Sequence, residues 1–129
     1  MVLLCIDDDP EDVELFIDAV KMIDRTHTCM VAINGIEALS TLANIIPDLI
    51  FLDINMPVMD GRETLAKIRS DERLRSVPIF ILSTSNDLKE AEACSKLGAT
   101  KWLVKPSSFT ELVRRLKTVF NEDYTSSVN

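Results

Sequence analysis

Short apolar runs alternate with longer segments of helical periodicity along the whole chain. The apolar runs predict five buried strands, each ending at a polar cluster or a proline. We expect these strands at residues 2–6, 29–33, 49–52, 79–82 and 102–104. We expect five helices between and after them, at residues 10–20, 36–43, 62–69, 88–97 and 109–120. Alternation of this kind predicts parallel βαβ units with right-handed crossovers.

The predicted helices offer unequal amounts of apolar surface. In the segment at 88–97 only Ala91, Cys94 and Leu97 form an apolar stripe, so little area is buried. This helix is therefore expected to be the least firmly held of the five. The highly charged segment at 70–76 is expected to be a solvated helix end and loop. The inward face of the helix at 36–43 is expected to consist of Ile36, Leu39 and Ala43.

The order of elements predicts the fold class and the domain organisation. A flavodoxin-like (βα)5 three-layer sandwich, with parallel sheet order 2-1-3-4-5, is the obvious arrangement for five such units. Residues 1–121 are expected to form this single domain. The polar residues 122–129 are expected to be a frayed C-terminal tail.

Composition narrows the possible partners. The 129 residues carry a net charge of −7, and an acidic domain repels phosphate backbones, which argues against direct nucleic-acid binding. No apolar run approaches the roughly 18–20 residues of a membrane span, so no membrane partner is expected. Cys5, Cys29 and Cys94 are odd in number and widely spaced. Their pattern argues against a disulfide framework or a zinc site and indicates a cytoplasmic location.

Polar side chains follow four of the predicted strands. They are Asp7 with Asp8, Asp53, Ser83 and Lys105. The carboxyl ends of parallel strands meet at one edge of a sheet, so these side chains should converge. Clustered carboxylates are tolerable only with a cation, bound protons or ample water, and oxygen ligands of this kind suit Mg²⁺. Together with a lysine and a hydroxyl they form a site for a phosphoryl group, with Asp53 as a possible nucleophile.

Several motifs at these strand ends identify a family. The sequence resembles the receiver domain of bacterial two-component response regulators, of the stand-alone chemotaxis-regulator type, over roughly residues 2–121. The matching motifs are Asp7-Asp8, Asp53 with Met56-Pro57, Asp60-Gly61, Ser83 and Lys105-Pro106. Each motif alone is weak, whereas the set, with each member at its own strand end, is specific.

The resemblance implies a function and a metal site. It implies that Asp53 accepts a phosphoryl group from a histidine kinase or a phosphotransfer protein. It also implies Mg²⁺ held by Asp8, Asp53 and the backbone carbonyl of Asn55, with Asp7 acting through water. The protein would then not be a turnover enzyme but a phosphoacceptor that catalyses its own phosphorylation and dephosphorylation.

The resemblance further implies a conformational switch. Lys105 would contact the phosphoryl oxygens, and the Lys105–Pro106 peptide would be cis. Ser83 and Trp102 would be the switch pair, with the Trp102 ring swinging from a more exposed to a more buried position. A downstream protein would read the face formed by the helix at 88–97, the strand at 102–104 and the helix at 109–120. The chain would act as a monomer or a homodimer.

Two departures from the family pattern leave the chemistry of the output face undetermined. Trp102 stands where Tyr or Phe is commoner, and Ser107 stands where an apolar residue is often found.

Two other functions compete with the leading one. An aspartyl-phosphate-forming metal-dependent phosphatase needs an acid two residues after its nucleophile, and that position is Asn55. A degenerate receiver acting as a constitutive binding module would lack acceptor residues, and all of them are present here.

The start of the last helix carries a further local expectation. Ser108 should cap this helix, with Glu111 three residues later completing a capping box.

Overall fold

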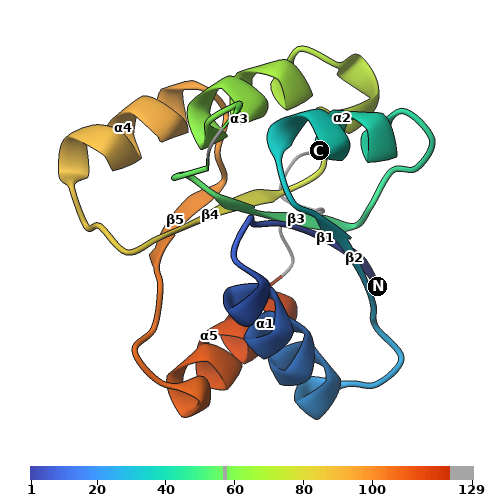
Figure 1. Ribbon diagram of the computed structural model, residues 1–129, viewed down its shortest axis with the longest axis vertical. Helices are drawn as coiled ribbons and strands as arrows, with labels where there is room; N and C mark the ends of the chain where they lie inside the picture. Colours follow the sequence, from blue (N-terminus) through green and yellow to red (C-terminus); the bar gives the residue numbers. More distant parts are fainter. Residues whose placement is uncertain (57, 123–129) are drawn as a thin grey trace.

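A five-stranded parallel sheet forms the middle layer of the molecule, and helices cover both of its faces (Figure 1). The computed structural model describes residues 1–56 and 58–122. Pro57 and all of the expected tail except residue 122 lie outside these residues. The strands are β1 (Val2–Ile6), β2 (Thr28–Ala32), β3 (Leu49–Asp53), β4 (Ile79–Ser83) and β5 (Lys101–Val104). The helices are α1 (Pro10–Ile23), α2 (Gly35–Leu42), α3 (Gly61–Arg69), α4 (Leu88–Lys96) and α5 (Phe109–Asn121), with a 3₁₀ turn η1 (Glu72–Leu74).

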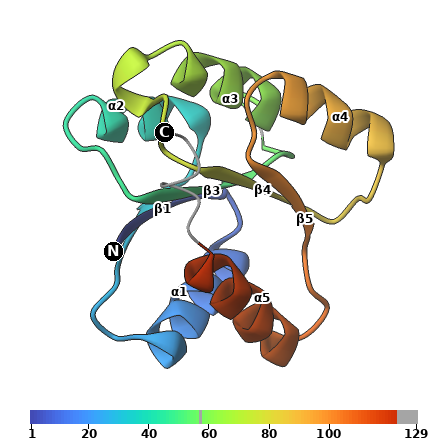
Figure 2. The ribbon, with the colours of Figure 1, turned by 180° about the vertical axis from the view of Figure 1, so that it is seen from behind.

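The strand order is β2-β1-β3-β4-β5, which confirms the expected topology. All four neighbouring pairs of strands are parallel. Helices α1 and α5 lie side by side on one face of the sheet, and α2, α3 and α4 cover the other (Figures 1 and 2). Because every strand runs the same way, the carboxyl ends of β1, β3, β4 and β5 meet at one edge.

The core has two parts, one on each face of the sheet. The part under α1 and α5 is built on aromatic rings, with the centroids of Phe16 and Phe51 4.9 Å apart and those of Phe51 and Phe80 5.3 Å apart. The part under α2, α3 and α4 is aliphatic. Successive residues of β3 alternate between the two, with Phe51 on one face and Ile50 and Leu52 on the other, as the strand period of two requires. This packing fixes β3 at the centre of the sheet.

Every helix begins at a capping side chain directly after the loop that leaves a strand. The cap oxygens accept a backbone N–H of the first turn, which satisfies one of the donors that a helix N-terminus leaves free. The capping residues are Asp9, Asn34, Asp60, Asp87 and Ser108. The expected cap at Ser108 is confirmed, because its Oγ accepts from the Glu111 N–H at 3.2 Å. The Glu111 carboxylate does not complete a capping box but pairs with Arg114.

The inward face of α2 differs from the sequence expectation at Ile36 and Ala43, which are exposed, whereas Leu39 packs against the core as expected. Gly35, Ala38 and Leu42 are buried, whereas the Ile36 side chain is 56% exposed. The cause is the close approach of α2 to α3, since a Cβ on Gly35 would collide with the Thr64 hydroxyl. The helix therefore turns its smallest residue toward its neighbour. Leu74 in η1 is likewise buried, so the expectation of a fully solvated segment at 70–76 is wrong at that position.

Helix α4 has the smallest buried face of the five helices. Among its residues only Cys94 is buried, while Leu88 at its start is 82% exposed. This agrees with the expectation of a lightly held helix. All three cysteines are free thiols, and burial raises the pKa of the Cys5 thiol. Within residues 1–56 and 58–122, no helix has the length and apolar content needed to span a membrane.

Candidate functional site

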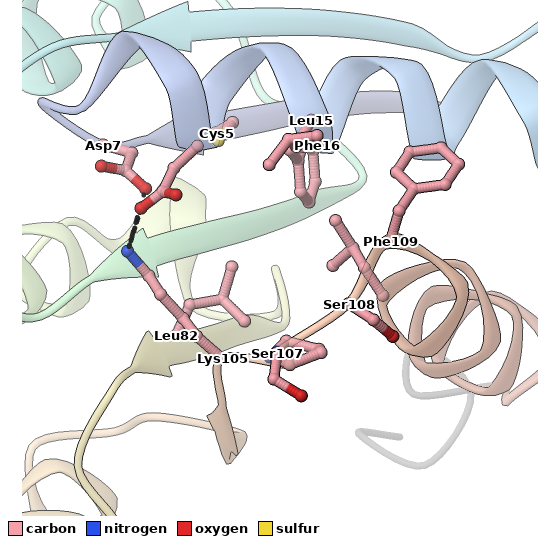
Figure 3. Close-up of a pocket in the computed structure, with 12 residues that line it drawn as sticks. Cys5, Asp7, Leu15, Phe16, Leu82, Lys105, Ser107, Ser108 and Phe109 are labelled. Carbon is pink, nitrogen blue, oxygen red and sulfur yellow. Dashed lines mark hydrogen bonds and ion pairs between the residues drawn. The ribbon is translucent and has the colours of Figure 1, made fainter.

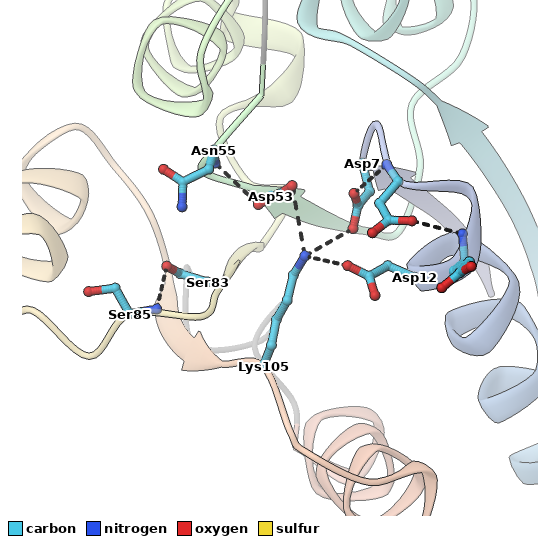
Figure 4. Close-up of polar contacts among 9 residues, drawn as sticks. Asp7, Asp12, Asp53, Asn55, Ser83, Ser85 and Lys105 are labelled. Carbon is cyan, nitrogen blue, oxygen red and sulfur yellow. Dashed lines mark hydrogen bonds and ion pairs between the residues drawn. The ribbon is translucent and has the colours of Figure 1, made fainter.

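Four side chains from four strand ends meet at one edge of the sheet (Figure 4). Asp7 follows β1, Asp53 is the last residue of β3, Ser83 is the last residue of β4, and Lys105 follows β5. Asp7, Asp53 and Ser83 are buried. The predicted convergence of the acids and the lysine is thus present in the structure, and it arises from the parallel strands that carry them.

Lys105 is the electrostatic centre of this group. Its Nζ lies 2.9 Å from Asp12 Oδ2, 3.3 Å from Asp7 Oδ2 and 3.8 Å from Asp53 Oδ2. Asp12, the nearest of the three, was not expected at the site from the sequence. It lies in the first turn of α1, one turn after the acidic loop that caps the helix. An acid in the first turn after a strand that ends in Asp-Asp is the signal that could have indicated it.

Burial shapes the charge of Asp53. Desolvation by burial raises the pKa of this carboxyl to about 6, and the neighbouring Asp7 carboxylate acts in the same direction, whereas the Asn55 N–H and the Lys105 charge lower it. The Asn55 N–H donates to Asp53 Oδ1 at 3.2 Å. Burial alone would lower the pKa of Lys105, but the hydrogen bond to Asp12 and the nearby charges of Asp7 and Asp53 raise it above its ordinary value. Lys105 therefore stays protonated and positive.

Three carboxylates could hold a divalent cation. Asp7, Asp8 and Asp53 each offer one oxygen, and these oxygens all lie within 4.8 Å of one another. Hard cations such as Mg²⁺, Mn²⁺ and Ca²⁺ prefer an all-oxygen set of this kind. Asp8 is exposed, which leaves room for water on the outer side of such an ion. Asp7 thus offers an oxygen to the cation site, as Asp8 does. That Asp7 acts through water and that the Asn55 carbonyl is a ligand stay predictions.

Two hydrogen bonds connect the site to Trp102. The Ser85 N–H donates to Ser83 Oγ at 3.1 Å, and the Trp102 indole N–H donates to the Ser85 carbonyl at 3.0 Å. Ser83 is fully buried, and the Trp102 ring is half-buried against the aliphatic part of the core. The loop between β4 and α4 is therefore attached to Ser83 at one end and to the ring at the other. A displacement of this loop would reach the ring through these two bonds.

The peptide bond before Pro106 differs from the expectation. The described residues contain no cis peptide bond, so the Lys105–Pro106 peptide is trans and the expected cis form is wrong for this structure. The trans isomer is the intrinsically favoured one for a bond before proline. With this bond trans, Lys105 already reaches the three carboxylates.

The sequence matches a known family over most of its length. Residues 3–117 match the response regulator receiver domain. PilG of Pseudomonas aeruginosa is 33% identical over 112 residues, which cover 80% of this chain and 83% of PilG. Other curated relatives are longer, and the aligned segments span 37% of one transcriptional regulatory protein and 52% of another.

Solved structures share the fold. The phosphorylated cyanobacterial phytochrome response regulator RcpA superposes with a TM-score of 0.84 at 30% identity, over 92% of this chain and 89% of RcpA. The Mn²⁺-bound form of the response regulator Rcp1 superposes with a TM-score of 0.82 at 27% identity, over 92% of this chain and 90% of Rcp1. One similar structure is thus phosphorylated and another holds a divalent cation.

Proposed function

The chain belongs to the response regulator receiver domain family, whose members signal through phosphorylation, and we propose that Asp53 is its phosphoacceptor. One observation separates Asp53 from Asp7, the other buried acid of the cluster. Asp7 is held by the Asp9 N–H at 3.0 Å and by Lys105 at 3.3 Å, whereas Asp53 Oδ2 lies 3.8 Å from Lys105. Asp53 Oδ2 therefore lies beyond hydrogen-bond range of Lys105, and the raised pKa of Asp53 makes it a more basic nucleophile than an ordinary aspartate.

The donor is a phosphohistidine of a histidine kinase or a phosphotransfer protein. An Asp53 carboxylate oxygen attacks phosphorus, an O–P bond forms, the N–P bond breaks, and the imidazole leaves with the electron pair and takes up a proton. Lys105 then donates to a phosphoryl oxygen as a fixed positive charge. Asp7, Asp8 and Asp53 would hold Mg²⁺, which supplies positive charge opposite the phosphoryl oxygens when bound.

This reaction ends at a signalling state rather than at a released product. A phosphatase of the aspartyl-phosphate type would need an acid two residues after Asp53, and Asn55 stands there with its N–H on Asp53. The protein accordingly acts as a regulator that takes a phosphoryl group from its donor and carries it on Asp53. Ser83, the Ser85 backbone and Trp102 form the route by which the group on Asp53 changes the face made by α4, β5 and α5.

Intact mass spectrometry after incubation with acetyl phosphate and Mg²⁺ tests the acceptor. The wild type should gain the mass of one phosphoryl group, and Asp53→Asn should gain none. EDTA should abolish the adduct, and Asp8→Ala should reduce it strongly. Asp18→Asn, which removes one exposed carboxylate from α1 away from the site, is the matched control and should behave as the wild type. A full adduct on Asp53→Asn would overturn the assignment.

A further inference from the structure

Asp12 makes the shortest contact to the site lysine, and the proposed function gives it no role. We propose that Asp12 is a positioning residue that holds Lys105 away from Asp53 until a phosphoryl group arrives. This inference rests on Asp53 being the phosphoacceptor. It begins with the sequence of the loop, in which Asp9 caps α1 and Pro10 opens it, so that Asp12 is placed in the first helical turn.

Three distances show how the Lys105 ammonium interacts with Asp12, Asp7 and Asp53 in the unphosphorylated protein. The contact to Asp12 at 2.9 Å and the contact to Asp7 at 3.3 Å are hydrogen bonds, whereas Asp53 at 3.8 Å is beyond hydrogen-bond range. A charge-assisted bond at 2.9 Å is a strong one. Asp53, the residue next to which Lys105 acts during phosphorylation, is therefore its most distant partner in the unphosphorylated protein.

Exposure shows which partner can release the lysine at least cost. The Asp12 side chain is 39% exposed, while those of Asp7 and Asp53 are 6% and 8% exposed. A partly exposed carboxylate can exchange a lost lysine for water, whereas a buried carboxylate that loses its ion-pair partner is shielded from the water that could replace it. Lys105 can thus leave Asp12 while its bond to Asp7 is kept.

Space beside the pair can accommodate the change that this movement makes at Asp12. A cavity of about 120 Å³ lies between α1 and the start of α5, with Lys105 at one end and Leu15 and Phe109 at the other (Figure 3). Asp12, the hydrogen-bond partner of Lys105, also lines it. Asp53 is not among the residues that line this cavity, so the cavity borders the position that Lys105 leaves when it moves toward Asp53. The same space can admit the water that solvates Asp12 after the lysine has moved.

A phosphoryl group on Asp53 supplies the competing attraction. It carries a charge of about −1.5 to −2 and three acceptor oxygens, against the single charge of Asp12. The lysine moves to the phosphoryl group, which attracts it more strongly. The free energy of the bond lost to Asp12 lowers the net affinity of Lys105 for that group. Removing the Asp12 carboxylate should therefore make the resting lysine more available to an anion at Asp53.

Calorimetric titration with beryllofluoride, a phosphoryl mimic, in the presence of Mg²⁺ tests this role. Asp12→Asn should bind the mimic tighter than the wild type by a factor on the order of three to ten, as expected for one partly exposed charge-assisted contact. Glu11→Gln removes the same charge from an exposed neighbour in the same turn and is the matched control. Asp12→Glu keeps a carboxylate and should return the affinity toward that of the wild type.

The outcomes separate this inference from the proposed function. If the wild type binds no mimic, or if Asp53→Asn binds it equally well, the phosphoacceptor itself is wrong. If wild type binds, Asp53→Asn does not, and Asp12→Asn is indistinguishable from Glu11→Gln or weaker than it, then Asp12 does not restrain Lys105. Asp12→Ser provides a second variant with a small polar side chain, should the asparagine variant fail to fold.

Discussion

The burial that makes Asp53 basic also makes its charge costly to the folded state. Its pKa is about 6 in the folded chain, against 3.8 for an ordinary aspartate. Between about pH 4 and pH 6 the folded chain thus binds more protons at this group than the unfolded chain, so stability falls as pH rises. The cost is complete above about pH 6 and absent below about pH 4. It is a metal-free property, since a bound cation would favour the carboxylate.

Asp53→Asn should therefore stabilise the metal-free protein at pH 7. The asparagine oxygen can still accept from the Asn55 N–H, while the buried charge is gone. In EDTA the free energy of unfolding should rise by about 1–2 kcal/mol at pH 7, and the difference should vanish near pH 4. Denaturant unfolding at both pH values measures this, with Asp18→Asn as the control. A gain of equal size at pH 4 would show that packing, not charge, is responsible.

The residues of the site differ in how far the sequence could indicate them. Asp7, Asp53 and Lys105 could be found because each stands directly at the end of an apolar run, and parallel strands bring such ends together. The contact between Asp12 and Lys105 joins residues 93 apart in the sequence and depends on how α1 sits over the sheet. No local pattern contains that information. The cis form expected before Pro106 came from the family resemblance and not from the residues themselves, and the structure has the trans form.

At the scale of elements, hydrophobic periodicity placed all five strands and helices but not every buried face. The order of strands follows from βαβ units, so it could be predicted. The rotation of α2 could not, because it depends on contact with α3 at Gly35 rather than on the apolar residues of α2 itself. The burial of Leu74 could not be predicted either, because a single apolar residue among charged ones shows no hydrophobic periodicity. Both misses arise where one helix or turn meets another away from the sheet.

The sparse packing of α4 predicts uneven local stability. Cys94 is the one buried residue of α4, whereas α1 buries Phe16, Ala19 and Val20. Less buried apolar area leaves less free energy to oppose local opening. In the unphosphorylated protein, amides of α4 should exchange at least about tenfold faster than those of α1. Hydrogen–deuterium exchange with mass spectrometry measures this, and equal protection of the two helices would contradict the account.

At the scale of the whole molecule, the tightly packed and the lightly packed elements lie on different sides of the site. The central strand β3, buried on both faces, fixes Asp53, and the aromatic core under α1 and α5 supports it. On the other side, the loop after Ser83 leads into lightly packed α4 and carries the bond to Trp102. When the charge at Asp53 changes, we therefore expect the strand and the aromatic core to stay in place and the loop after Ser83 to move. A partner that binds the two arrangements with different affinity turns this into a signal.

Fluorescence of Trp102, the only tryptophan in the sequence, tests this central claim most directly. Beryllofluoride with Mg²⁺ should draw the Ser83 hydroxyl toward Asp53, move the Ser85 carbonyl, and so alter the emission and quencher access of the indole in the wild type. The change should be reduced in Ser83→Ala and absent in Asp53→Asn. If calorimetry shows the mimic bound at Asp53 while the Trp102 signal stays constant, the path through Ser83 and Ser85 does not transmit the phosphorylated state.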